Sequence, residues 1–293
     1  MRVSLSVTNY SWRDGALGAK LAHVVRAADR GGLDTVWVAD HLLQADPFVA
    51  PGETEHLEAY TALGFLAGQT ERVRLGTMVT GVTFRAPALL IKAVTTLDVL
   101  SNGRAWFGVG AGYQQDEARW MGLDVPPLPE RFERLEDTLR LALQMWAGDE
   151  TPFESAHYRL ERPVSSPNPV QQPHPKILIG GTGERRTLPL VVRYADACNV
   201  FDIPDGGETV RRKLDVLARL CDEAGRPLRS IDKTISTRLA RDEPAEQFAE
   251  RCAGFAELGL DHVVVIVAGP WTEEAVGTLT AAVPGVRDLT SRA

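Results

Sequence analysis

Short apolar runs rich in β-branched residues alternate with longer amphipathic runs along the whole chain. The short runs have the length of buried strands, and the longer runs carry apolar residues at the 3.6-residue period of a helix. The predicted strands are residues 3–7, 35–39, 73–80, 105–110, 176–179, 197–201, 231–237 and 262–267. The predicted helices are residues 17–30, 60–69, 87–100, 131–146, 185–194, 210–224, 246–258 and 272–282. Eight strands, each followed by a helix, predict an α/β fold: a (β/α)8 TIM barrel with insertion loops, as one domain over residues 1–293.

An open, doubly wound α/β sheet is the alternative to a barrel. Such sheets usually have fewer strand–helix units in this length, and they open with a Gly-x-Gly-x-x-Gly turn after the first strand. Here residues 8–12 read Thr-Asn-Tyr-Ser-Trp, which is no such turn. The sequence therefore favours the barrel.

Two long stretches interrupt the repeat. Residues 42–58 follow the second strand, and residues 149–175 follow the fourth helix and include a hairpin-like piece at 153–160. Long ordered loops in a compact domain are usually functional. Active sites of barrels lie at the C-terminal ends of the strands. We therefore expect residues 42–58 to form a lid or pocket wall, and residues 149–175, at the opposite end, to serve the structure or an oligomer contact.

Composition and charge narrow the class of protein. The chain has 44% apolar and 24% charged residues and a formal net charge of −7, so it lacks the basic surface of a nucleic-acid-binding protein. We find no run of about 18 apolar residues and no signal peptide, so we expect no membrane span and a cytoplasmic protein. The three cysteines form no CxxC pair and are expected to be buried or half-buried free thiols in a reducing compartment. The six histidines show no metal-binding spacing, so no metal is expected.

Glycine-rich turns follow two neighbouring predicted strands. Gly180, Gly181 and Thr182 follow the fifth strand and precede a helix, where exposed backbone amides and the helix dipole favour an anion, and Arg185 and Arg186 add donors. The backbone turn after the fourth strand contains three further residues, Gly110, Ala111 and Gly112. Two such turns suit one extended phosphate-bearing ligand, although a tight turn can also need glycine for its backbone conformation alone.

An acidic and a basic side chain stand together at the end of the second strand. Asp40 can orient His41 or raise its pKa, and either residue could act as a general acid or bind a heterocycle. The alternative is a capping Asp beside a partly exposed His. No Gly-x-Ser-x-Gly motif is present, so the chemistry of a serine hydrolase is not indicated.

Several of these segments, in this order and spacing, resemble the luciferase-like monooxygenase superfamily, and most closely its coenzyme F420-dependent oxidoreductases. The segments are residues 34–41 (Asp-Thr-Val-Trp-Val-Ala-Asp-His), 76–80 (Gly-Thr-Met-Val-Thr), 84–88 (Phe-Arg-Ala-Pro-Ala), 96–104 (Thr-Leu-Asp-Val-Leu-Ser-Asn-Gly-Arg), 108–113 (Gly-Val-Gly-Ala-Gly-Tyr), 131–135 (Arg-Phe-Glu-Arg-Leu) and 179–181 (Ile-Gly-Gly). The resemblance covers nearly the whole chain and implies a bacterial-luciferase-like barrel that usually forms a homodimer.

The resemblance also implies where a cofactor lies. A deazaflavin or flavin ring would lie across the barrel mouth, with its phosphate on the turns after the fourth and fifth strands. The ring would lie against Met78, Val79 and Thr80, and the Met78–Val79 bond matches a non-proline cis peptide of the family. Asp40 matches a residue that contacts the head group of the deazaflavin.

Two residues are the implied candidates for proton transfer. His41 matches a candidate active-site acid. Tyr113 stands where the glucose-6-phosphate dehydrogenases of this branch carry a Glu, which puts oxidation of a sugar phosphate in doubt, although its phenol can still donate a proton.

The expected reaction is hydride transfer between C5 of coenzyme F420 and a small organic substrate, with His41 or Tyr113 moving the accompanying proton. The alternative is an FMN-dependent monooxygenase that uses reduced flavin and O2. A separate flavin or F420 reductase is expected to supply reducing equivalents. A barrel that binds a cofactor without catalysis is a third reading, disfavoured because Asp40, His41 and the glycine turns are all present. The sequence does not name the substrate, but the short loop at residues 203–208 suggests an open pocket that admits a bulky one.

Overall fold

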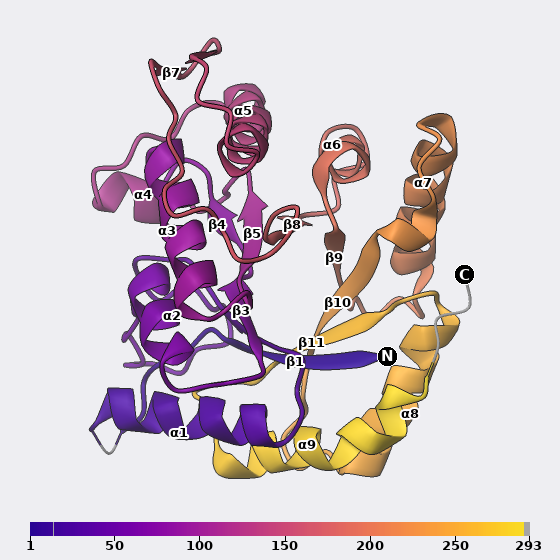
Figure 1. The fold of residues 1–293 in the computed structure, drawn as a ribbon. Coiled ribbons are helices and arrows are strands. Elements are labelled where there is room, and N and C mark those ends of the chain that lie inside the picture. Colours follow the sequence, from indigo (N-terminus) through magenta and orange to yellow (C-terminus); the bar gives the residue numbers. More distant parts are fainter. Residues whose placement is uncertain (14, 290–293) are drawn as a thin grey trace.

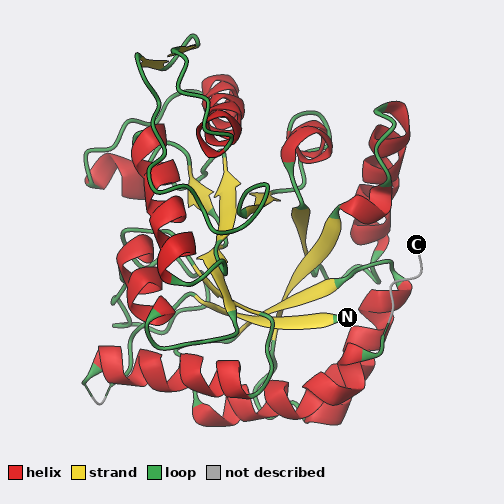
Figure 2. Ribbon diagram, viewed as in Figure 1, coloured by secondary structure: helices red, strands yellow, loops and turns green. Residues whose placement is uncertain are grey.

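The computed structural model describes residues 1–13 and 15–289, and it consists of a ring of parallel strands surrounded by helices (Figure 1, Figure 2). The strands of the main sheet, in the order in which they pair, are β3 (Arg74–Thr77), β2 (Thr35–Val38), β1 (Arg2–Val7), β11 (His262–Ile266), β10 (Asp232–Arg238), β9 (Ala197–Phe201), β8 (Lys176–Gly180), β5 (Trp106–Gly110) and β4 (Thr80–Gly81). The helices are α1 (Leu17–Arg30), α2 (Ala59–Ala67), α3 (Pro87–Leu100), α4 (Gln115–Trp120), α5 (Leu128–Trp146), α6 (Thr187–Tyr194), α7 (Glu208–Glu223), α8 (Ala245–Glu257) and α9 (Glu273–Arg287), with a short 3-10 helix, η1 (Leu228–Ser230).

The two ends of this sheet meet and close the barrel. Leu75 of β3 forms a parallel bridge with Ala105, next to β5, and the Leu75 amide donates to the Arg104 carbonyl at 2.9 Å. The predicted TIM barrel is thereby confirmed. The predicted third strand, 73–80, is wrong as one unbroken element, because β3 pairs with β2 whereas β4 pairs with β5. The Met78–Val79 peptide between them is cis, as the resemblance implied.

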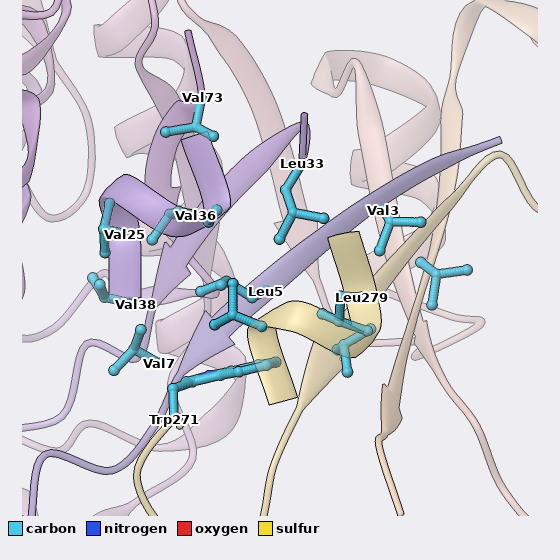
Figure 3. Close-up of a cluster of buried hydrophobic side chains, with 14 of the residues drawn as sticks. Val3, Leu5, Val7, Val25, Leu33, Val36, Val38, Val73, Trp271 and Leu279 are labelled. Atoms are coloured by element: carbon cyan, nitrogen blue, oxygen red, sulfur yellow. The ribbon is translucent and has the colours of Figure 1, made fainter. Parts of the chain in front are cut away.

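Side chains along each strand point alternately outward, toward the helices, and inward, into the barrel, which produces two apolar layers. Val3, Leu5 and Val7 of β1 point outward and pack with Leu279 of α9 and with Trp271, the contact drawn in Figure 3. Side chains of period two point to one face of a strand, so the residues between them face the barrel interior. This outer layer holds the helices against the ring.

Side chains fill the barrel interior. At two glycines there is no space for even a Cβ atom. The rings of Trp37 and Trp106 lie 5.6 Å apart in this inner layer. A Cβ on Gly76 would lie 2.6 Å from Trp106, and one on Gly108 would lie 1.8 Å from the Thr77 carbonyl oxygen. The barrel interior is therefore a packed core and not a pore.

The long excursion between α5 and β8 has two parts. Its hairpin, β6 (Phe153–Glu154) with β7 (Arg159–Leu160), is confirmed as antiparallel and lies along α5, where Arg140 stacks over Phe153 at 5.4 Å. Farther along, the Gln171 side chain donates to the Ala105 carbonyl at 2.7 Å. This second part therefore packs at the N-terminal ends of the strands, the end where we expected the whole excursion.

Two further features concern the cysteines and the apolar length of the helices. All three cysteines are buried free thiols, as predicted. Among the residues that the structure describes, no helix combines the length and the apolar character needed to cross a bilayer.

Candidate active site

The carboxylate that follows β2 is held by a bidentate ion pair. Asp40, whose side chain is fully buried, accepts from Arg85 Nη1 at 2.6 Å and from Arg85 Nη2 at 2.9 Å. Arg85 also pairs with Glu58 at 2.5 Å and lies 4.9 Å above the Tyr60 ring. Burial alone would lower the pKa of Arg85, but its bonds to Asp40 and Glu58 outweigh burial and raise that pKa. The Arg85 guanidinium therefore stays charged. It forms a fixed ion pair with Asp40 at the C-terminal end of β2.

The next residue along the chain, His41, lies in a second hydrogen-bonded group. Its Nδ1 lies 2.7 Å from Glu117 Oε2, and its Nε2 lies 3.3 Å from the hydroxyl of Tyr113. The predicted proton-transfer residues His41 and Tyr113 are therefore brought together, and Tyr113 remains largely exposed. Loss of solvent around its hydroxyl, which faces His41, followed by the charges of Glu117 and Asp46, raises the pKa of Tyr113, so its phenol is neutral at neutral pH.

The rings of His56 and Tyr10 pack in a row beside His41. The His56 ring lies edge-on to His41 at 6.2 Å and to Tyr10 at 5.2 Å. Burial, followed by the nearby His41, lowers the pKa of His56. Burial, followed by the charge of Asp40, raises the pKa of Tyr10, and its buried hydroxyl has no partner among the described residues. Both side chains are thus neutral at neutral pH. Together they form an aromatic, uncharged surface beside His41.

The floor of the mouth is the side chain of Val79. A Cβ on Gly180 would lie 2.6 Å from Val79 Cγ2, and one on Gly110 would lie 3.0 Å from the same carbon. These two glycines are therefore required by contact with Val79. Met78, the preceding residue, donates its amide to the Val38 carbonyl at 3.0 Å, which ties this floor to β2.

Thr80 lies below the floor. Its side chain is fully buried, and its hydroxyl lies 2.9 Å from Tyr60 Oη and 3.0 Å from Thr77 Oγ1. Its hydroxyl therefore stabilises the packing under Val79, and we place no cofactor contact on it.

The two glycine-rich turns leave their backbone amides unpaired. Within residues 1–13 and 15–289, no amide from 111 to 113 or from 181 to 186 donates a hydrogen bond. Gly112 and Gly181 have φ values of 76° and 99°, a region that other residues rarely adopt. Residues 111, 112 and 180–182 are half-buried, so the amides of Ala111, Gly112, Gly181 and Thr182 lie near the surface. Amides in this state are suited to bind an anion.

A buried cation lies beside the first of these turns. Arg131, at the start of α5, is 6% exposed and donates from Nη1 to the Gly112 carbonyl at 2.5 Å. Its Nε is buried and has no partner among the described residues. Nearby, Arg186 stacks over Phe132 at 5.6 Å. Both guanidinium groups favour negative charge close to the glycine turns.

The loop at residues 42–58 is fixed over the other side of the mouth. Asp46 accepts from the Thr8 hydroxyl at 2.9 Å and pairs with Arg238 of β10 at 2.8 Å. Asn9, after β1, donates to Glu53 at 2.8 Å. The loop therefore walls the mouth at the ends of β1 and β10, the position that we predicted for it.

A cavity of about 640 Å³ lies beside the loop that follows β9. It is bounded by this loop, α7 and α8, and its lining includes Ile203, Arg211 and Arg251. Arg251 is engaged there by Glu243 at 2.9 Å and by the Thr237 hydroxyl at 2.6 Å. The lining of this cavity includes neither His41 nor a residue of the glycine turns, so we do not assign the chemistry to it.

Sequence reasoning missed four charged residues of the site: Glu58, Arg85, Glu117 and Arg131. Arg85 and Arg131 lie in segments that resemble the family, so the resemblance marked their positions. An arginine at either position does not by itself indicate what the side chain binds. Glu58 caps α2, where its carboxylate accepts from the Tyr60 and Thr61 amides. Glu117 lies on α4, a helix that the hydrophobic pattern did not predict.

Known proteins match this chain in sequence and in fold. The family model described as luciferase-like monooxygenase matches residues 2–277. The chain belongs to the luciferase-like monooxygenase family. Its predicted membership is thereby confirmed, and with it the enzyme class, an oxidoreductase.

One curated relative and two solved structures illustrate what the chain is similar to. An F420-dependent glucose-6-phosphate dehydrogenase of Amycolatopsis mediterranei (strain U-32) is 32% identical over 241 residues, which are 80% of this luciferase-like chain and 68% of the relative. An F420-dependent secondary alcohol dehydrogenase, solved with an F420–acetone adduct, superposes with a TM-score of 0.83 at 17% identity, over 98% of this chain and 99% of that one. The EDTA monooxygenase of Chelativorans sp. BNC1 superposes with a TM-score of 0.79 at 15% identity, over 100% and 95% of the chains.

Proposed function

We propose that this chain is an F420-dependent oxidoreductase that moves a hydride between the coenzyme and a small organic substrate. The observation that carries the proposal is that unpaired amides, an apolar side chain and a proton-transfer pair lie next to one another at the barrel mouth. Unpaired amides from 111 to 113 and from 181 to 186 lie on either side of the Val79 floor, and Tyr113 joins the first turn to His41 at 3.3 Å. A ligand with an anionic tail and a flat ring fits this arrangement.

The chain's own residues fit coenzyme F420. The phosphate would lie on the amides of Gly112, Gly181 and Thr182, near the unpartnered Nε of Arg131. The ring would pack against Val79. When bound, the coenzyme supplies a deazaflavin C5 that accepts or donates a hydride.

Asp40 contributes a fixed charge in this proposal and moves no proton. Both of its carboxylate oxygens accept hydrogen bonds from Arg85, so the two side chains form one largely buried ion pair. His41 and Tyr113, which face each other, then remain as the pair that gives or takes the proton accompanying the hydride.

An uncharged alcohol or carbonyl compound is the substrate class that the mouth supports best. Arg238, the cation at the end of β10, is occupied by Asp46 and by the Phe48 ring at 4.1 Å. Phe201, at the end of β9, is 55% exposed and offers an apolar contact instead. Together with Tyr113 in place of Glu, this argues against a sugar phosphate as the substrate. The exposure of Phe201 also supports an open pocket beside residues 203–208.

An FMN-dependent monooxygenase is the second candidate, favoured by the structural similarity to the EDTA monooxygenase. Equilibrium titration of the purified protein with F420 and with FMN, followed by fluorescence, distinguishes the two. We expect micromolar binding of F420 and none of FMN. Binding of FMN alone would overturn the proposal in favour of the monooxygenase.

Three further expectations remain predictions and extend the proposal. They are a homodimer, a cytoplasmic location, and a separate F420 reductase that supplies reducing equivalents. Light scattering of the purified protein tests the first of them, with twice the 32.0 kDa chain mass as the expected result.

A further inference from the structure

Glu117 divides its two carboxylate oxygens between different kinds of donor. Oε1 accepts from the Leu42 and Leu43 backbone amides, the latter at 2.8 Å. Oε2 lies 2.7 Å from His41 Nδ1. The Glu117 side chain is 5% exposed and the His41 side chain 17%, so both groups are held largely out of water. The carboxylate therefore faces two backbone donors on one oxygen and one imidazole nitrogen on the other.

A carboxylate facing Nδ1 determines which nitrogen of a neutral imidazole carries the proton. An ionised carboxylate is only an acceptor, so Nδ1 must be the protonated nitrogen and Nε2 the one with the lone pair. We propose that Glu117 is a positioning residue that holds His41 with its proton on Nδ1 and presents the Nε2 lone pair to the barrel mouth, beside the Tyr113 hydroxyl.

The other groups that face His41 are compatible with this arrangement. Tyr113 offers a neutral phenol, which donates to an unprotonated Nε2 at 3.3 Å. The His56 ring packs edge-on against His41 and is kept neutral by burial. The charge of the adjacent Asp40 is taken up by Arg85. Glu117 is thus the group whose charge is directed at the His41 ring.

The tautomer gives His41 a definite task, and this part of the inference rests on the proposed function. When an alcohol carbon loses a hydride to oxidised F420, the O–H bond breaks and its proton passes to Nε2, directly or through Tyr113. The C–O bond becomes a carbonyl, and His41 becomes an imidazolium paired with Glu117. In the reverse direction Nε2–H returns the proton to the carbonyl oxygen. An imidazole with its proton on Nε2 could not accept there.

Substituting Glu117 by Gln tests the tautomer. The single oxygen of the new side-chain amide would stay with the two backbone amide donors of Leu42 and Leu43, which leaves the side-chain NH2 facing Nδ1. The ring must then accept at Nδ1 and carry its proton on Nε2. The readout is long-range 1H–15N correlation of the full chain, labelled with 15N-histidine and without coenzyme, at a pH where the ring is neutral. The His41 signals are assigned by their loss in His41→Asn.

We expect the wild type to carry the proton on Nδ1 and Glu117→Gln to carry it on Nε2. Asp116→Asn, on the same turn of α4 but exposed, is the matched control and should keep the wild-type tautomer. A wild-type ring protonated on Nε2 would overturn the proposal without any variant. A folded Glu117→Gln protein with an unchanged tautomer would overturn it as well.

Kinetics separate this inference from the proposed function. With F420 and a substrate alcohol, Glu117→Gln should lower kcat roughly 10²-fold and leave the Kd for F420 unchanged. An equal loss in KM and kcat would indicate a merely structural role. Failure of the wild type to bind F420 would overturn the proposed function. The tautomer of His41 is measured without coenzyme, so that result would still decide whether Glu117 positions the ring.

Discussion

At the scale of single residues, the shape of the mouth depends on the contact of Val79 with Gly110 and Gly180. Gly180→Ala would place a Cβ 2.6 Å from Val79 Cγ2, closer than carbon atoms pack. Overpacking of this kind costs about 1–3 kcal/mol of unfolding free energy. Because the clash involves Val79 alone at this distance, Val79→Ala in the same chain should restore most of the loss.

Urea denaturation of the two single variants and the double variant measures this coupling. Gly64→Ala is the control, because a Cβ there meets nothing within 4 Å and lies inside α2. It should stabilise the protein slightly, by about 0.5–1 kcal/mol. Additive losses in the double variant would mean that Val79 and Gly180 are not in contact.

A second residue-scale prediction concerns the anion site. Thr182→Asp should weaken binding of F420 by about tenfold or more, because a carboxylate would face the coenzyme phosphate at the amides of the turn. Thr182→Asn has the same shape without the charge and should bind nearly as the wild type does. Thr182 is preferable to Gly181, where the φ of 99° strains any side chain. Equal affinities of both variants by fluorescence titration would place the phosphate elsewhere.

The residues that the sequence identified were those whose chemistry is local. Asp40 with His41 and the glycines of the two turns follow strands directly, so the position of each could be predicted from the strand pattern. Arg85 and Glu117 reach the site from 45 and 76 positions farther along the chain than their partners Asp40 and His41. No local pattern reports such pairs, because the folded barrel alone brings them together.

At the scale of elements, the loop at residues 42–58 is held to the barrel through Asp46. This side chain, 4% exposed, accepts from Thr8, from Arg238 and from the Phe48 amide. Asp46→Asn removes the charge from these bonds, each of which is worth about 1.5–3 kcal/mol when charged. We expect amide hydrogen exchange across residues 44–54 to become about tenfold faster.

Hydrogen exchange followed by mass spectrometry measures this effect peptide by peptide. Glu55→Gln changes an exposed carboxylate on the same loop that accepts from the Thr54 amide, and as the control it should leave exchange at residues 44–53 unchanged. If Asp46→Asn exchanged at the wild-type rate, the loop would be held by its other contacts, and Asp46 would not fix the wall of the mouth.

Helices and strands were predictable where one periodicity ran the full length of an element. The pattern missed α4, a six-residue helix with little apolar character, and it treated 73–80 as one strand although the chain changes pairing partner at Met78–Val79. It also ended the last helix at Ala282, whereas α9 continues through Pro284 to Arg287. Val286 is fully buried, so packing against the barrel overrides the local preference there.

At the scale of the whole molecule, the N-terminal end of the barrel contains a buried histidine. His262 of β11 is hydrogen-bonded to the Ser4 hydroxyl, and burial lowers its pKa despite the nearby charge of Asp34. The unfolded chain then binds a proton that the folded protein does not. Stability is therefore full above a pH of about 6.5 and is lost as the pH falls below it.

We predict that His262→Gln reduces the difference in unfolding free energy between pH 7.5 and 5.5 by about 1 kcal/mol. Urea denaturation at both pH values measures this difference. His23→Gln, at a ring that is 51% exposed, is the control and should change it little. A His262→Gln protein with the pH dependence of the wild type would assign the acid sensitivity to other groups.

The central claim for the whole molecule is that unpaired amides of two turns hold the anionic part of coenzyme F420 at the barrel mouth. Backbone 1H–15N spectra of the deuterated protein, recorded during titration with F420, test it most directly. We predict that the largest shifts fall on Gly112, Gly181 and Thr182. Unmoved signals there, with shifts instead at Arg211 and Arg251 around the cavity between α7 and α8, would contradict the account.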